Sequence, residues 1–310
     1  MTTRATVCAV SAMGLWLGCG STPTTKPAPA EPYLQPLDAP RLARRMRLDL
    51  HGVLPTVDEL NAVETRPGSL ADLRASWMDS PRYETRLVDI FAEKWQTRID
   101  LFHVFWTEYE ALDDRGATIE YPFERSVSDE PLRLMAHLAA TDAPWTDIVN
   151  ADYTMANALL EDIWPLERDA EAGDDGWTVA YYTDGRPPVG ILATNGLWWR
   201  YHTTATNGNR ARAAMMMKML ACDDIQALPV TFTEAPSLVD GASIEDALKE
   251  DPYCIGCHTT VDPIASALFG FWSSNEHSAT ENHVYHPERE LLGEQYLGVT
   301  PAWYGQPCTA

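Results

Sequence analysis

Residues 80–95, SPRYETRLVDIFAEKW, contain the strongest secondary-structure signal in this chain of 310 residues. Ser80 followed by Pro81 is a typical helix start, because a serine side chain can cap unpaired backbone N–H groups and proline fits the first helical position. Large apolar residues then recur at every fourth position: Tyr83, Leu87, Phe91 and Trp95. This spacing places them along one side of a helix, so we expect an amphipathic helix that packs against a core.

Helical signals of the same kind extend in both directions from this segment. Thr56 and Glu59 form a capping-box pattern, and Ser69 precedes another amphipathic stretch. Further helices are predicted at residues 38–50, 130–140, 152–163, 189–202 and 210–221. Because the period-two alternation of strands is almost absent, the predicted fold is all-α. Long irregular stretches are expected at 108–129, at 164–188 and after 271.

The length and a hydrophobic content of 45% allow one large domain or two small ones with a full core. The predicted segments are a signal peptide at 1–18, a Pro/Thr-rich tether at 19–37, an N-terminal helical region at 38–163, an acidic loop at 164–188, a C-terminal helical region at 189–272 and an irregular tail at 273–310.

The N-terminus has the features of an export signal. Arg4 supplies a positive charge, and residues 5–18 form an apolar run that is too short to span a bilayer. Cys19 follows Leu15-Trp16-Leu17-Gly18, which is similar to the lipobox of bacterial lipoproteins, with tryptophan where leucine is usual. We therefore expect a periplasmic or outer-membrane or cell-surface lipoprotein lipidated at Cys19, with cleavage of an ordinary signal peptide as the alternative.

The net charge of -22 excludes whole classes of partner. Nucleic acid and anionic lipid surfaces both require a positive face, so we expect neither to bind directly. Part of the acidity is concentrated in residues 167–175, ERDAEAGDD. Such a run is typical of a solvated loop, while calcium binding and the docking of a basic redox partner remain open.

Residues 254–258, CIGCH, form the motif with the most specific chemistry. In c-type cytochromes two thiols at this spacing attach one haem, and the adjacent histidine binds the iron. The sequence therefore predicts one haem c, bound by Cys254 and Cys257, with His258 as the proximal iron ligand. Two alternatives remain: a small-loop disulfide between the two cysteines, or a zinc site that adds His283 or His286 to these residues.

The other cysteines fit an oxidising compartment. Cys8 leaves with the signal peptide, and Cys222 and Cys308 are the pair that remains for a structural disulfide. The predicted disulfide would close a loop that contains the haem motif.

The second axial iron ligand decides the predicted function. No methionine follows Met219, so an ordinary downstream methionine ligand is missing. We place His202 first, ahead of an open site and of the other candidates, which are Met215, Met216, Met217, Met219, His277, His283 and His286. Two strong ligands favour electron transfer, whereas an open site would bind small molecules or peroxide. Because no Arg–His pair of a peroxidase is recognisable, we expect an electron carrier rather than a catalyst.

Tryptophan is abundant, with 11 residues, and this leaves a carbohydrate-associated role as a further alternative. Trp198, Trp199, Trp303 and Tyr304 could stack on sugar rings. No pair of carboxylates stands out as catalytic.

Several segments resemble one family in the same order along the chain. These are RRMRLDLHGVLPTVDEL at 44–60, SPRY at 80–83, DYTMAN at 152–157, GILATNG at 190–196 and DPYCIGCHTTVDPI at 251–264. Together they resemble the planctomycete and myxobacterial cytochrome c-like surface proteins. The resemblance implies an extracytoplasmic haem-type module and identifies no substrate. Residues 265–272, ASALFGFW, depart from the family pattern because they lack its acidic pair.

Overall fold

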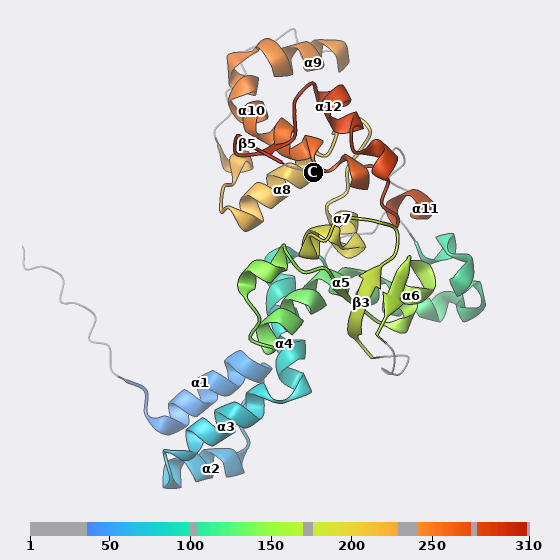
Figure 1. Ribbon diagram of the computed structural model, residues 1–310. Coiled ribbons are helices and arrows are strands. Elements are labelled where there is room, and N and C mark those ends of the chain that lie inside the picture. The colour runs from blue at the N-terminus through green and yellow to red at the C-terminus, as the bar shows by residue number, and fades with distance from the viewer. Residues whose placement is uncertain (1–35, 99–104, 170–175, 229–240, 274–277, 309–310) are drawn as a thin grey trace, which may run out of the picture. The chain divides into compact units, whose positions relative to one another are not determined.

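The computed structural model describes residues 36–98, 105–169, 176–228, 241–273 and 278–308 (Figure 1). The chain separates into the units Met1–Asp38 and Ala39–Ala310, and every helix and strand described below belongs to the second. The predicted signal peptide, Cys19 and most of the tether lie outside the described residues. In the part of the chain that the structure describes, no helix is long and apolar enough to cross a membrane.

The first three helices form a small layer with its own core. They are α1 (Ala39–His51), α2 (Val57–Thr65) and α3 (Ser69–Met78). The capping box is confirmed, because the Thr56 side chain accepts from the Glu59 N–H and Glu59 accepts in return from the Thr56 N–H. Trp77 is buried between the helices and donates its indole N–H to Glu59 at 2.9 Å. One glutamate thus caps α2 and positions the largest core residue.

The longest predicted helix is confirmed as α4 (Pro81–Trp95). The Ser80 side chain accepts from the Arg82 N–H, as expected for an N-cap, and the helix ends at Gln96 in the left-handed conformation. Val88 and Trp95 are buried, and Leu87 and Phe91 pack partly buried against the same core. This face of α4 lies against α5 (Glu120–Ala140).

The predicted irregular stretch at 108–129 was wrong. Short 3₁₀ helices cover Trp106–Glu108 and Glu110–Ile119, and α5 begins at Glu120, ten residues before the predicted start. The first half of α5 buries Ser126, Ser128, Asp129 and Glu130. Ser128 bonds within the helix, but Ser126, Asp129 and Glu130 find partners in distant segments, so the buried face of α5 does not appear as an apolar stripe in the sequence.

A small sheet replaces part of the predicted helix at 152–163 and crosses the predicted acidic loop. It consists of β1 (Thr154–Ala156), β3 (Thr178–Tyr182) and β2 (Leu166–Arg168), antiparallel in that order. Only α6 (Ala158–Ile163) remains of the predicted helix. Strands of three to five residues are too short to show alternation, which explains why sequence patterns missed them. The fold is therefore mostly helical rather than all-α.

The C-terminal part is also built mainly from helices. They are α7 (Asn195–Arg200), α8 (Arg210–Leu220), α9 (Gly241–Glu250), α10 (Pro252–Ser266), α11 (Ala279–Asn282) and α12 (Leu292–Leu297). The tail expected to be irregular contains the last two helices and a short hairpin of β4 (Ala302–Trp303) and β5 (Gln306–Pro307). It is held in place by close contacts: a side chain at Gly293 would overlap the Ser266 carbonyl group, and one at Gly270 would overlap Tyr285.

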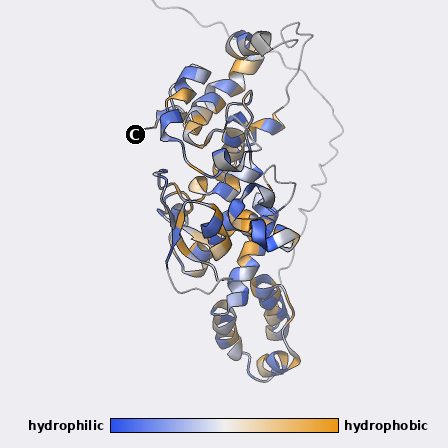
Figure 2. Cartoon of the chain, turned by 90° about the vertical axis from the view of Figure 1, so that its right-hand side faces the viewer, coloured by the Kyte–Doolittle hydropathy of each residue, from blue (hydrophilic) through white to orange (hydrophobic). Residues whose placement is uncertain are grey.

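The largest core joins α4, α5, α7, α8 and α10, with fully buried members on each helix. In Figure 2 hydrophobic and hydrophilic residues alternate along most helices, as expected for helices that cover a core with one side and face water with the other. Met215, Met216 and Met217 are buried in this core.

Candidate functional site

The CIGCH motif lies inside one continuous helix, α10. Pro252 occupies its first position, and the Asp251 carbonyl group accepts from the N–H groups of Cys254 and Ile255. Cys254, Cys257 and His258 are spaced three and four residues apart, so they lie on one side of the helix, and all three are half-buried. The helix continues past the motif to Ser266, with Pro263 inside it.

His258 is held at one ring nitrogen by a carboxylate one turn further along α10. Its Nδ1 lies 2.9 Å from Oδ1 of Asp262. Arg210, at the start of α8, donates from Nε and Nη2 to the two oxygens of Asp262, at 2.8 and 3.1 Å. Burial opposes ionisation of Asp262, but the hydrogen bonds from His258 and Arg210 outweigh it and lower the pKa of the carboxyl group. Because an ionised carboxylate only accepts, a neutral His258 carries its proton on Nδ1.

This arrangement leaves the other imidazole nitrogen for a ligand. The Nε2 of His258 has no hydrogen-bond partner among the described residues. A metal-binding histidine commonly donates its remote N–H to a carboxylate in this way, which fixes the tautomer and the ring orientation.

The two thiols and the residue between them fit the attachment of a planar group. Cys254 and Cys257 are both free. Burial, followed by the charge of Asp251 and the neighbouring Cys257, raises the pKa of the Cys254 thiol, so it stays protonated at neutral pH. Apart from its own stretch of helix, no atom lies within 4 Å of the position that a Cβ on Gly256 would take. The helix surface at Gly256, between the two cysteines in the sequence, is therefore open.

The other predicted ligands are distributed over different parts of the fold. His202 is half-buried in the segment between α7 and α8, and its role as distal ligand stays a prediction. His286 contacts Glu288 and the Glu281 carbonyl group, and the carbonyl group of His283 belongs to a separate polar cluster described below. His277 lies outside the described residues.

In the described part of the chain, Cys254 and Cys257 form neither a disulfide with each other nor part of a zinc site. Among the residues described, no three His, Cys, Asp or Glu side chains gather closely enough to hold a metal ion. Cys222 and Cys308, predicted to form a disulfide, are both exposed free thiols. Trp198 and Trp199 are 3% and 5% exposed, which leaves them no free face for a sugar.

A second polar cluster was missed by sequence reasoning and centres on Glu130 of α5. Glu130 is fully buried. It accepts hydrogen bonds from the Tyr182 hydroxyl at 2.7 Å, the Gly196 N–H at 2.9 Å and the Thr154 hydroxyl at 3.1 Å. Burial raises its pKa to about 7, although the three donors and nearby Arg186 act in the opposite direction.

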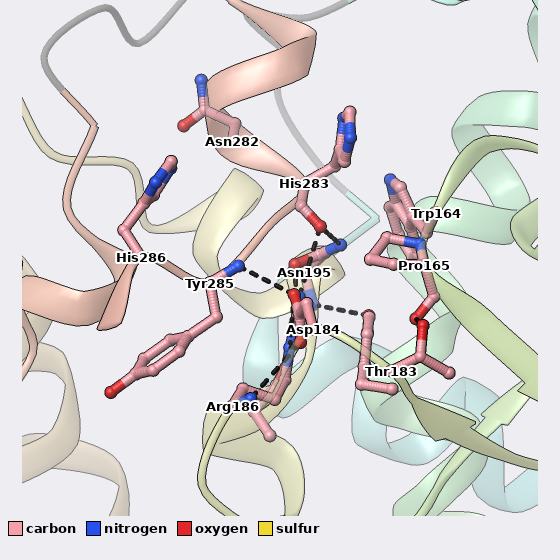
Figure 3. Close-up of polar contacts among 12 residues, drawn as sticks. Trp164, Pro165, Thr183, Asp184, Arg186, Asn195, Asn282, His283, Tyr285 and His286 are labelled. Atoms are coloured by element: carbon pink, nitrogen blue, oxygen red, sulfur yellow. Dashed lines mark hydrogen bonds and ion pairs between the residues drawn. The ribbon is translucent and has the colours of Figure 1, made fainter. Parts of the chain in front are cut away.

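Arg186 occupies the centre of the same cluster (Figure 3). Its guanidinium group lies 3.4 Å from the centroid of the Tyr182 ring and forms an ion pair with Asp184 at 2.6 Å. It also donates to Asn195 and to the carbonyl groups of Ala193 and His283. The Asn195 amide donates to the same His283 carbonyl group, and Asp184 accepts from the Tyr285 N–H.

The geometry indicates a structural cluster rather than a reaction site. The cavity beside Thr154, Tyr182 and Arg186 encloses about 50 Å³, which is room for one or two water molecules. The polar side chains of the cluster form hydrogen bonds and ion pairs with one another or with nearby backbone groups. They come from four segments far apart in the sequence. No local sequence signal marks Glu130, which reads as an ordinary surface residue of a helix.

Comparison with family models, curated proteins and solved structures found no match to this chain.

Proposed function

We propose that the protein is an extracytoplasmic electron-transfer protein that carries one c-type haem. The observation that supports this most is the state of His258: it shares a helix face with two free thiols, and Asp262 holds its Nδ1 so that Nε2 faces away from the carboxylate. A cysteine pair used only as a disulfide would not need this arrangement.

Each residue of the site has a separate role in binding the haem. Cys254 and Cys257 would form the two thioether links, the Nε2 of His258 would bind the iron, and His202 is the first candidate for a second ligand. Bound haem supplies a reversible one-electron change at iron. Asp262 fixes the ring of His258, and its negative charge behind the ligand would favour ferric iron and lower the reduction potential. Arg210 limits this effect because it shares the same carboxylate.

The remaining parts of the proposal rest on the sequence. Export and lipidation at Cys19 would anchor the protein in the periplasm or at the cell surface, where haem attachment takes place. The net charge of -22 suits docking to a basic redox partner. This role agrees with the resemblance to cytochrome c-like surface proteins, which covers the haem motif and its surroundings.

Pyridine haemochrome spectra of the full chain, matured with a bacterial haem-attachment system, test the proposal directly. We expect an α-band typical of thioether-linked haem and one iron per chain. The double variant Cys254→Ala/Cys257→Ala should lose the covalent haem. The matched control, Cys222→Ser/Cys308→Ser, removes the same number of thiols and should keep it.

A colourless protein after maturation would rule out the haem proposal. Stoichiometric zinc in that protein, lost in the Cys254→Ala/Cys257→Ala variant but kept in the control, would instead support the zinc alternative. Electron paramagnetic resonance of the haem form would show whether a second axial ligand is present, and the variant His202→Ala would show whether His202 supplies it.

A further inference from the structure

A large pocket lies away from the CIGCH motif. It has a volume of about 760 Å³, and its lining comes from the second half of α4, the 3₁₀ helix Trp145–Ile148, α8 and the C-terminal hairpin. Phe91, Trp145 and Trp303 form aromatic parts of its wall, and Met216 and Met219 contribute aliphatic surface. Pockets that bind small molecules have this size and are mostly apolar, with a few polar groups that orient the ligand.

The aromatic wall includes one large apolar side chain, Trp145, whose exposure to solvent is not explained by packing in the core. Trp145 is 51% exposed although it lines the pocket. Its ring stacks on Phe91, with centroids 5.6 Å apart and an interplanar angle of 25°. Two nearly parallel rings, one of them half-exposed, offer a flat surface on which a further planar ring can stack.

The charge of the pocket is opposite to that of the protein. Lys94 is the only charged side chain among the described residues that line it. Lys94 is exposed and forms no ion pair with a carboxylate in the described part of the chain. In a chain of net charge -22, a lysine left unpaired beside an apolar pocket favours an anionic group on the ligand.

We propose that this pocket binds a planar aromatic molecule that carries one anionic group. The rings of the ligand stack on the free face of Trp145, which itself stacks on Phe91, the apolar body contacts Met216 and Met219, and the anionic group lies beside Lys94. None of these residues belongs to the CIGCH motif, so with His202 rather than Met216 or Met219 as the second iron ligand the proposal holds whether or not the protein carries haem.

Two fluorescent probes that share one aromatic frame test it in the full chain. 1-Anilino-8-naphthalenesulfonate has a sulfonate, and N-phenyl-1-naphthylamine lacks it. We expect saturable binding of both at one site. The variant Lys94→Glu should weaken the sulfonate probe by about fivefold, since one exposed ion pair contributes up to about 1 kcal/mol, and should change the neutral probe less than about twofold.

Matched variants distinguish probe binding in the pocket from a general effect of the protein's charge. Arg74→Glu makes the same charge change at an exposed position of α3 and should leave both probes within about twofold. Met219→Trp fills the pocket and should weaken both probes. Trp145→Ala should also weaken the binding of both probes. Because Trp145 is half-exposed, we expect this variant to keep its fold.

Three results would each overturn the proposal. They are the absence of saturable binding, an equal loss of the sulfonate probe in Lys94→Glu and Arg74→Glu, and unchanged binding of both probes in Trp145→Ala. Near-ultraviolet circular dichroism of each variant establishes that probe binding is compared between folded proteins.

Discussion

The CIGCH helix and the Glu130–Arg186 cluster both contain a carboxylate that pairs with an arginine, yet they differ in what remains unpaired. In the cluster, Asp184 and Glu130 are saturated by donors from the protein itself. On α10, Asp262 is also saturated, but its partner His258 keeps one nitrogen without a partner among the described residues. A complete set of partners indicates structure, whereas a positioned group with an unused atom indicates a ligand.

Exposure separates the two regions in the same way. His258 and the two cysteines are half-buried at a helix surface, whereas Glu130 is fully buried and Arg186 is 9% exposed. A cofactor can reach the first region and not the second. The comparison therefore predicts that changes in the cluster affect folding and that changes on α10 affect the bound group.

Removal of the arginine in the cluster should have the largest effect. Arg186→Ala leaves Asp184 buried without its ion pair and leaves the carbonyl group of Ala193 and the Asn195 side chain without a donor. We expect the free energy of unfolding to fall by about 3–5 kcal/mol. Arg210→Ala, which removes the arginine on the α10 side, should cost only about 1–2 kcal/mol, because the Arg210 side chain is 19% exposed against 3% for Arg186 and Asp262 keeps its contact with His258. Urea denaturation at pH 7 measures both, and similar losses would contradict the distinction.

The pH dependence of the free energy of unfolding should reveal the raised pKa of Glu130. Its pKa is about 7 in the folded protein, above the ordinary value of 4.5, so the folded state binds the proton more tightly. The contribution of Glu130 is therefore fully present below about pH 4.5 and is lost as the pH rises through 7.

The variant Glu130→Gln provides the reference for this measurement. The difference in unfolding free energy between the native protein and the variant should fall by roughly 3 kcal/mol between pH 4 and pH 8. Parallel curves for the two proteins would show that Glu130 does not titrate in this range.

Removal of the charge behind His258 should change the haem rather than the fold. In Asp262→Asn the amide oxygen can still accept from Nδ1, but the negative charge is gone, so ferric iron is less stabilised. Under the proposed function we expect the midpoint potential to rise by on the order of 50–100 mV, in line with the tenfold to hundredfold effects of partners behind metal ligands. Asp246→Asn, at an exposed position of α9, is the control. Equal shifts in both variants would mean that Asp262 acts only through net charge.

The same contrast explains what could be predicted from the sequence. The helix at Pro81–Trp95, the capping box at Thr56 and the CIGCH motif each depend on residues within a few positions of one another, and local patterns identify them. The early start of α5 and the three-stranded sheet depend on partners 20 to 70 residues away, such as Gly196 for Glu130. Asp262 could have been identified from the sequence, because it lies four residues after His258, but Pro263 is a residue type that usually marks a helix start or break, so helical spacing across it is not expected.

A pair of glycines provides the smallest and most local test of the comparison. Gly256 lies inside α10 with open space around it, and Gly196 lies inside α7, where a side chain would overlap the Val127 carbonyl oxygen. Gly256→Ala should stabilise the haem-free protein by about 0.5–1 kcal/mol, because alanine favours a helix over glycine and meets no neighbour. Gly196→Ala should destabilise it, because Gly196 must stay close to α5 to donate to Glu130. Thermal unfolding of the two variants measures the difference, and a loss of stability in Gly256→Ala would mean that the helix surface at Gly256 is covered.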